Sequence, residues 1–405
     1  MGTIDNDEEN DTEFDKQRDR MSKRLEEMKK QHKRQLLGRK IIKFSPIILT
    51  TVVAVGVCGN YYLKSNFSKK KNVSQIEVSI DDNLRQKPNE SANAATECTS
   101  VEEPSKKYEA TILDSTDKFA DDVVSSNGIL VNADTMQVLS ERNAKEKMYP
   151  ASMTKVMTVL VAAEALDQKA LDDTFEITID ITDYSYSNDC SAAGFSVGEN
   201  VKIKDLFYGT VLPSGGDAAL ALATYVAGSH EKFVEMMNKK AKELGISDTT
   251  HFTNCVGLYN DEHYSTAYDM AMIMAAAMDN TFCKEVLSTH HYVTQPTTQH
   301  PDGIELSNWF LRRIEDKEIG GTVLCGKTGF VVQSGNCAVS YATDKAGTNY
   351  IICTGHSSSA WQCIRDQTYL YSHYMNGLAL EAANSGSSSK EDMEKKTPVI
   401  DQKSN

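Results

Sequence analysis

The segment YPASMTKVMTVLVAAEAL, residues 149–166, is apolar on nearly every side of a helical turn. A helix that is apolar all round belongs in a domain interior, so we expect a central, buried helix over residues 151–166. Two polar side chains, Ser152 and Lys155, lie one turn apart on one face of this helix. Burying an ammonium group without a partner costs free energy, and such a group usually loses its proton. Lys155 is therefore either less buried than the pattern predicts or part of a chemical site.

The rest of the central region predicts both strands and helices. NGILVNADTMQVLSER (127–142) is typical of a β-hairpin about an Asn-Ala-Asp-Thr turn, and three β-rich runs follow at 321–331, 335–343 and 348–356. We expect helices at 201–212, 218–228, 266–278 and 360–380, the third capped by Ser265 or Thr266. A hairpin, a helical middle, three strands and a closing helix favour an α+β fold with one antiparallel sheet and helices packed on it.

Charge and hydropathy distinguish the N-terminal part of the chain. The 405 residues carry a formal net charge of −14, which argues against nucleic-acid binding because phosphate backbones require clustered Lys and Arg. Basic residues cluster at 20–43, directly before residues 44–63, which have no charge and are long enough to cross a lipid bilayer as a helix. We expect one transmembrane helix at 44–63 with its N-terminus in the cytoplasm. A cleaved signal peptide is the alternative.

The remaining boundaries follow from composition. We expect a cytoplasmic charged segment at 1–43, a flexible extracytoplasmic linker at 64–107 and a disordered tail at 381–405. Residues 108–380 have the composition of one globular domain, which would lie outside the cytoplasm.

Nine cysteines and nine histidines show no metal-ligand spacing, with no CxxC pair and no HExxH, so we expect no metal and no cofactor. Cys58 lies in the predicted span, and the other eight cysteines permit disulfides without establishing any. Four cysteines lie in apolar or strand-like contexts, where a small buried thiol is expected: Cys190, Cys255, Cys325 and Cys353. No G-x-S-x-G motif is present, and three histidines are expected to be surface or satisfied core residues: His251, His263 and His356.

Ser-x-x-Lys occurs five times in the chain, so the pattern alone indicates little. Four matches fall in linkers, tails or amphipathic surfaces, and only Ser152 with Lys155 lies on the predicted buried helix. There the serine lies in the first helical turn, and a neighbouring amine can take its proton. An unperturbed lysine is neutral at pH 7 in only about one molecule in 2,500. A lysine base therefore needs burial or a nearby cation to lower its pKa.

Residues 321–328, GTVLCGKT, match the phosphate-binding pattern GxxxxGK[ST]. That pattern needs a loop followed by a helix, whereas the residues here favour a strand, so nucleotide binding is the weaker alternative. We expect Lys327 and Thr328 on a strand edging a cleft, where they can hold a carboxylate, and Gly329 to let a ligand approach the backbone. Ser214 lies in a Gly-rich turn ahead of a helix and would, taken alone, be an ordinary helix cap.

In chain order, SMTK (152–155), SGG (214–216) and KTG (327–329) resemble the three-motif set of penicillin-binding proteins and serine β-lactamases. The segments MYPASMTKVMT, LFYGTVLPSGGDAA, HFTNCVGLYNDEHYSTAYDMAMI and VLCGKTGF resemble the serine-type D-alanyl-D-alanine carboxypeptidases, which are low-molecular-mass penicillin-binding proteins. The likeness covers roughly residues 110–378. It implies a β-lactamase/transpeptidase-like fold with an all-helical subdomain, and an enzyme of peptidoglycan biosynthesis at the bacterial cell membrane.

The resemblance implies a serine peptidase reaction. Ser152 would attack the terminal D-Ala-D-Ala bond of a peptidoglycan stem peptide, release D-alanine and form an acyl-enzyme that water hydrolyses. Lys155 would be the base, kept neutral partly by the charge of Lys327. Ser214 would relay protons to the leaving amine, and β-lactam antibiotics would acylate the same serine.

The resemblance also implies the binding groups. Lys327 and Thr328 would bind the substrate's terminal carboxylate, beside Gly329. The backbone N–H groups of Ser152 and Phe330 would form the oxyanion hole.

Gly216 departs from the family's usual pattern, in which Asn contacts the substrate and the motif lysine from this substrate-binding position. Losing such a contact costs roughly 1 to 3 kcal/mol, at most about a hundredfold in rate. A catalytically weakened penicillin-binding or wall-binding module is therefore an alternative. A serine β-lactamase is another, disfavoured because no Glu-x-x-Leu-Asn-type stretch lies between the second and third motifs. We expect neither the second β-rich domain nor the C-terminal anchor that many relatives carry.

Overall fold

The computed structural model of the chain describes residues 108–375. The predicted cytoplasmic segment (1–43), transmembrane helix (44–63), linker (64–107) and tail (381–405) lie outside these residues, as does the end of the predicted domain, 376–380. Between residues 108 and 375, no helix is both long enough and apolar enough to cross a bilayer.

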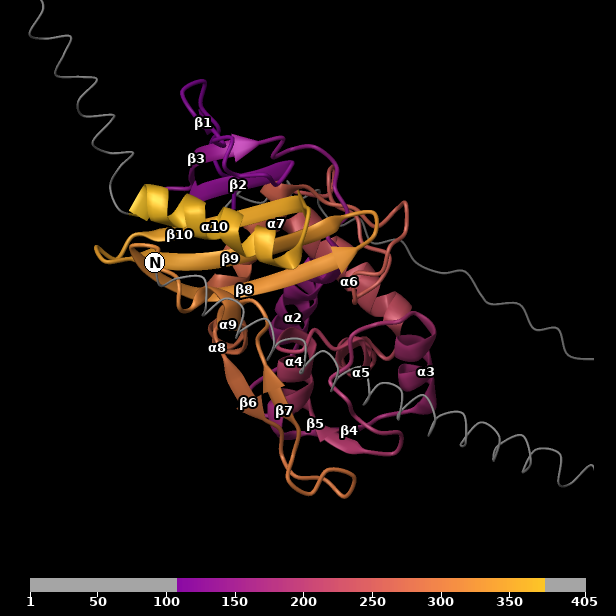
Figure 1. The fold of residues 1–405 in the computed structure, drawn as a ribbon. Helices are drawn as coiled ribbons and strands as arrows, with labels where there is room; N and C mark the ends of the chain where they lie inside the picture. The colour runs from indigo at the N-terminus through magenta and orange to yellow at the C-terminus, as the bar shows by residue number, and fades with distance from the viewer. Residues whose placement is uncertain (1–107, 376–405) are drawn as a thin grey trace, which may run out of the picture. The chain divides into compact units, whose positions relative to one another are not determined.

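A six-stranded sheet in the order β1-β3-β2-β10-β9-β8 forms the centre of the described part (Figure 1). Its strands are β1 (Asp117–Lys118), β2 (Asn127–Asn132), β3 (Gln137–Arg142), β8 (Gly321–Val331), β9 (Gly335–Asp344) and β10 (Asn349–Ser357). The predicted hairpin and the three later strands are confirmed. The predicted strands are antiparallel to their neighbours, as expected, and β1, which the sequence did not predict, pairs in parallel with β3.

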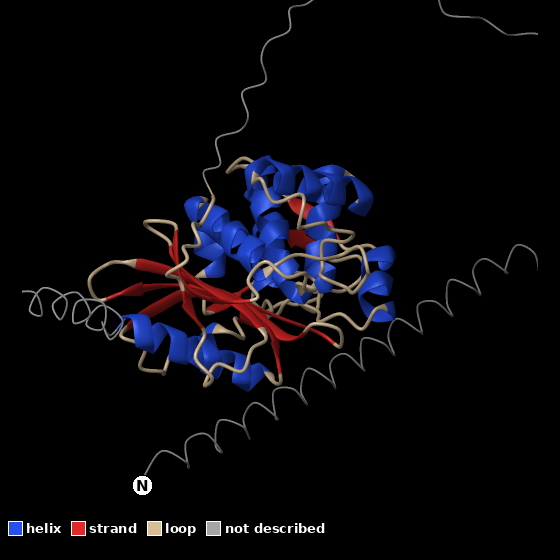
Figure 2. Ribbon diagram, turned by 90° about the horizontal axis from the view of Figure 1, so that it is seen from above, coloured by secondary structure: helices blue, strands red, loops and turns tan. Residues whose placement is uncertain are grey.

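Alternate residues of the central strands face two separate cores. In β10, Ile351 and Cys353 belong to a core that includes residues of α2 (Thr154–Ala165), α5 (Gly216–Ala227) and α7 (Ala267–Asp279). Tyr350 and Ile352 belong to a second core with α9 (Leu311–Ile314) and α10 (Ala360–Met375). Figure 2 shows helices on both sides of the sheet.

The helix predicted at 151–166 is confirmed as a central, buried element. A 3-10 turn, η2 (Ala151–Met153), leads into α2, and every residue from 154 to 162 is buried. The predictions at 218–228 and 266–278 correspond to α5 and α7. Thr266, and not Ser265, caps α7, because its side chain accepts a hydrogen bond from the backbone N of Asp269 at 2.9 Å.

The helical part of the domain is not all-helical, contrary to the prediction. It holds two short antiparallel strand pairs, β4 (Thr174–Glu176) with β5 (Asn200–Lys202) and β6 (His291–Val293) with β7 (Glu305–Ser307). The helix predicted at 201–212 begins only at α4 (Ile203–Val211), because Val201 and Lys202 pair with β4. The sequence did not predict α3 (Ile179–Ser187), η3 (Ala170–Asp172), α6 (His230–Glu243) or α8 (Thr281–Leu287).

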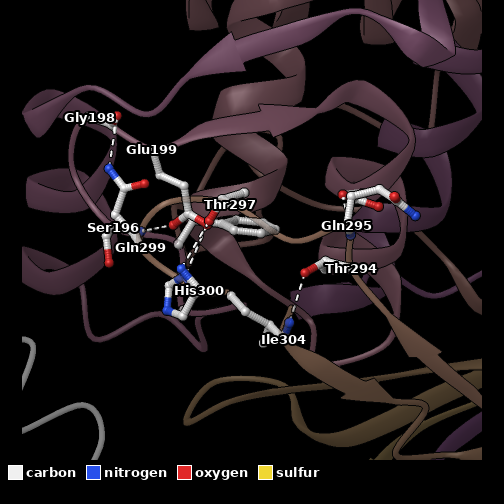
Figure 3. Close-up of polar contacts among 12 residues, drawn as sticks. Ser196, Gly198, Glu199, Thr294, Gln295, Thr297, Gln299, His300 and Ile304 are labelled. Atoms are coloured by element: carbon white, nitrogen blue, oxygen red, sulfur yellow. Dashed lines mark hydrogen bonds and ion pairs between the residues drawn. The ribbon is translucent and has the colours of Figure 1, made fainter. Parts of the chain in front are cut away.

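A buried carboxylate holds the loop between β6 and β7 against the segment before β5. Glu199 Oε1 lies 2.9 Å from His300 Nδ1 and accepts a hydrogen bond from Thr297 Oγ1 at 2.7 Å, while Oε2 accepts one from Ser196 N at 2.7 Å (Figure 3). Glu199 is only 1% exposed, so these contacts replace the water that a carboxylate needs. The two small strand pairs are therefore held together.

Candidate active site

Ser152 and Lys155 meet at the N-terminal end of α2. Ser152 lies in η2 and is half-buried, whereas Lys155 is only 2% exposed. Lys155 Nζ donates hydrogen bonds to Ser152 Oγ at 3.1 Å and to the backbone carbonyl of Val256 at 2.7 Å. Ala151, just before the serine, has a φ of 46°, a strained backbone conformation that in non-glycine residues concentrates at functional sites. The predicted serine and lysine are thus in direct contact.

Burial lowers the pKa of Lys155 from its ordinary value of 10.5 to about 8, because the charged form loses its hydration. Negative charge on Cys190, Cys255 or Asp217 acts in the opposite direction. The sequence had attributed part of this shift to Lys327, but burial is the main cause. Burial, and after it repulsion from Lys155, holds the pKa of Lys327 well below its usual value.

Lys327 and Ser214 form a second lysine–serine contact. Lys327 Nζ donates hydrogen bonds to Ser214 Oγ at 2.9 Å and to the Thr328 carbonyl at 2.8 Å. Ser214 precedes α5 with a φ of 62°, and the residue that caps this helix is Gly215. The helix-cap interpretation of Ser214 is therefore wrong, and its hydroxyl is a partner of a buried lysine.

Two glycines allow separate segments to approach the backbone of Ser152. A Cβ on Gly329 would lie 2.9 Å from Ser152 N, and a Cβ on Gly257 would lie 1.9 Å from the carbonyl oxygen of Ala151. Gly257 also has a φ of +88°, which favours glycine. The sequence analysis assigned Gly329 to the approach of a ligand, which stays a prediction, and it missed Gly257.

The remaining predicted binding residues lie on β8 around Gly329. Thr328 is half-buried, and the side chain of Phe330 is 61% exposed. Because Gly329 lies against Ser152 N, the backbone N–H groups of Ser152 and Phe330 come from two neighbouring segments. Their assignment to an oxyanion hole stays a prediction.

A loop at 254–258 positions the carbonyl that accepts from Lys155. Asn254 Oδ1 accepts hydrogen bonds from three backbone N–H groups, those of Val256 at 3.2 Å, Gly257 at 2.7 Å and Leu258 at 3.0 Å. Its Nδ2 donates to the carbonyl of Leu258 at 3.0 Å. One amide side chain thus fixes the whole turn. The sequence analysis missed Asn254, although an Asn ahead of a Gly is typical of such turns.

His263 connects this loop to α2. Its Nδ1 lies 3.3 Å from Asn254 Nδ2, and its Nε2 lies 2.8 Å from Thr154 Oγ1. Burial lowers the pKa of His263 to about 3, so the ring is neutral. His263 is the satisfied core residue that the sequence predicted.

Asp217 organises the start of α5. Its buried carboxylate accepts hydrogen bonds from the backbone N of Ala193 at 2.8 Å, Gly194 at 2.9 Å and Phe195 at 3.3 Å. These contacts hold the segment before β5 against the turn that carries Ser214. Gly216, the position predicted to contact substrate, lies in the first turn of α5.

The phosphate-binding alternative is wrong. Residues 321–328 lie wholly inside β8, so no loop and no helix N-terminus follow the glycines. Among residues 108–375, no three His, Cys, Asp or Glu side chains gather in a way that could hold a metal ion. All seven cysteines of this part of the chain are free, and Cys255, Cys325 and Cys353 are buried as predicted, whereas Cys190 is half-buried.

The fold is of the penicillin-binding protein and DD-transpeptidase type. The family model described as D-alanyl-D-alanine carboxypeptidase matches residues 114–355. The chain belongs to this family.

Curated relatives match over part of their length. D-alanyl-D-alanine carboxypeptidase DacF of Bacillus subtilis is 40% identical over 149 residues, which are 37% of this chain and 38% of that protein. DacC of Escherichia coli is 38% identical over 178 residues, 42% of this chain and 44% of that protein. The matched region is thus less than half of either relative.

Solved structures match more of the domain. The Streptomyces K15 DD-transpeptidase superposes with a TM-score of 0.56 and 28% identity, over 62% of this chain and 98% of that chain. Penicillin-binding protein 5 of Haemophilus influenzae superposes with a TM-score of 0.55 and 26% identity, over 62% of this chain and 71% of that chain.

Proposed function

We propose that this chain is a serine-type D-Ala-D-Ala carboxypeptidase, which removes the terminal D-alanine from peptidoglycan stem peptides through an acyl-enzyme on Ser152. The observation that carries the proposal is the 3.1 Å contact between Ser152 Oγ and a buried Lys155 whose pKa is lowered to about 8. An amine that is neutral in a substantial fraction of molecules at neutral pH can accept the serine proton. Family membership supports the same reaction.

The second lysine–serine pair supports the later steps. Lys327 Nζ holds the Ser214 hydroxyl at 2.9 Å, and Ser214 relays a proton to the departing amine. Lys327 and Thr328 bind the substrate's terminal carboxylate, and the backbone N–H groups of Ser152 and Phe330 stabilise the tetrahedral oxyanion. β-Lactam antibiotics acylate Ser152 in place of the peptide.

We also propose that the chain is anchored in the bacterial cell membrane by residues 44–63. The uncharged span directly after a basic cluster supports an N-terminus in the cytoplasm and a domain on the outer side. Carbonate extraction of membranes, with protease digestion of intact spheroplasts, tests this topology. Release of the chain by carbonate would contradict it.

D-alanine release from a pentapeptide tests the activity. The full-length protein should release D-alanine, and Ser152→Ala should not. Ser229→Ala is the matched control: Ser229 belongs to another Ser-x-x-Lys, but it caps α6 by accepting from Lys232 N at 3.3 Å. This control should retain activity and lose roughly 1 kcal/mol of stability. Wild-type protein that releases no D-alanine would refute the proposal.

Gly216 favours a second candidate, a penicillin-binding module with little catalysis. Such a module would be labelled by fluorescent penicillin at Ser152 without releasing D-alanine. Rapid penicillin turnover would instead indicate a β-lactamase. If an amine acceptor is added and a peptide joined to that amine forms, the activity is transpeptidation, as named for the Streptomyces protein.

A further inference from the structure

Cys190 is fixed against the start of α5. It follows α3, and its backbone N donates a hydrogen bond to the Ser185 carbonyl at 2.9 Å. The next carbonyl, that of Ser191, accepts a hydrogen bond from Gly216 N at 2.7 Å. These backbone bonds on either side of Cys190 give its side chain a defined place beside Gly216.

Cys190 and a side chain at position 216 exclude each other. A Cβ on Gly216 would lie 2.7 Å from Cys190 Cβ and 3.1 Å from its Sγ. Real Cβ atoms do not approach another carbon to 2.7 Å, and both contacts involve atoms close to fixed backbone. The family's usual Asn therefore does not fit at position 216 while Cys190 is present.

The Cys190 side chain lies against the first residue of α5. Cys190 is half-buried, whereas the six other cysteines between residues 108 and 375 are buried. Burial raises the pKa of the Cys190 thiol, and the charge of Lys155 acts in the opposite direction. Gly216 itself lies two residues after Ser214.

We propose that Cys190 and Gly216 are a coupled pair, in which Cys190 supplies the cleft wall that a side chain at 216 would otherwise form. Cys190 is then a positioning and specificity-determining residue, because it limits the room beside an acyl group on Ser152. The identity of that acyl group rests on the proposed function. The steric coupling does not.

Four variants of the full-length protein test the coupling: Gly216→Asn, Cys190→Gly with Gly216→Asn, Cys190→Ala with Gly216→Asn, and Cys190→Gly alone. Gly216→Asn should lower the thermal midpoint and slow acylation by fluorescent penicillin at least about tenfold. Adding Cys190→Gly, which removes both Cβ and Sγ, should restore the midpoint and most of the rate. Adding Cys190→Ala should restore less, because the 2.7 Å contact with Cβ remains.

A Gly216→Asn protein that matches wild type in both measurements would overturn the proposal. So would a double variant with Cys190→Gly that is no better than Gly216→Asn. If Gly216→Asn does not fold, recovery of folded protein in the double variant supports the pair, and continued misfolding overturns it. These stability outcomes hold whether or not the wild type releases D-alanine, so failure of the proposed function is recognised separately.

Protection against alkylation tests whether Cys190 faces the acyl group. Iodoacetamide should modify Cys190, by peptide mass, at least about ten times more slowly after penicillin has acylated Ser152. Modification should slow acylation of wild type but leave the rate of a Cys190→Ala protein at its own untreated value. Equal labelling with and without penicillin would show that Cys190 does not line the site and would overturn its specificity role.

Discussion

Lys155→Met should separate stability from activity. The change keeps most of the side-chain volume and removes the buried ammonium group, whose pKa falls from 10.5 to about 8 on folding. A shift of that size corresponds to about 3 kcal/mol of lost stability below pH 8. The variant also leaves the Val256 carbonyl without its hydrogen bond, which costs about 1 to 3 kcal/mol. We expect the variant to be at least as stable as wild type at pH 7, while acylation of Ser152 is abolished.

The change of this stability difference with pH is the more decisive measurement, because the cost of the unpaired Val256 carbonyl is the same at every pH. Between pH 8 and 10.5 the unfolded chain binds the Lys155 proton and the folded chain does not, so wild-type stability rises with pH. From about pH 7 to pH 9.5, wild type should gain about 2 kcal/mol relative to the variant. The variant also loses the repulsion between Lys155 and Lys327, which raises its stability relative to wild type at pH 7.

Urea denaturation followed by tryptophan fluorescence measures this difference, since both tryptophans of the chain, Trp309 and Trp361, lie in the domain. Lys239→Met is the matched control, because that side chain is 79% exposed and pairs only weakly with Glu243 at 3.7 Å. It should shift stability by less than about 0.5 kcal/mol. A wild-type and Lys155→Met difference that is constant over this pH range would refute the claim that burial lowers the pKa of Lys155 to about 8.

Three further experiments test the site. The rate of Ser152 acylation should rise with pH around a midpoint near 8, because Lys155 accepts a proton only when neutral, and a rate that falls there would contradict its role as base. Asn254→Ala should lower the unfolding free energy by about 2 to 3 kcal/mol, because three backbone N–H groups lose their acceptor, whereas Asn254→Asp keeps it; unchanged denaturation of the Ala variant would argue against this anchor. Gly257→Ala should abolish acylation by fluorescent penicillin, whereas Gly198→Ala, at a similar positive φ with nothing within 4 Å, should cost about 1 to 2 kcal/mol and keep it. Equal acylation in the two alanine variants would exclude the predicted clash.

The long helices and strands could be predicted because the spacing of apolar residues indicates which sides of an element are buried. The helix that carries Lys155 is apolar on all sides, and a helix of that kind has no exposed face to present. Short strands such as β4 and β5, in which Phe175 pairs with Val201, could not be predicted. A strand of three residues is too short to show a periodic pattern, and its pairing depends on a partner about 25 residues away.

Local sequence also could not assign the side chains that support the site. Asn254 and Gly257 act through a turn whose carbonyl reaches Lys155 about 100 residues earlier in the chain. The exclusion between Cys190 and Gly216 is likewise a contact between separate segments, the one that follows α3 and the start of α5. Motif spacing predicted which residues react, whereas the residues that support them depend on tertiary structure.

The position of β10 between β2 and β9 has a consequence for biogenesis. Cys353 pairs with Ile129, so the first hairpin of the domain and its last strand complete each other across more than two hundred residues. Until residues 349–357 have left the ribosome, β2 lacks this neighbour and its apolar strand edge stays available to other chains. The central sheet therefore closes only after nearly the whole domain has been synthesised, which favours slow folding and dependence on chaperones.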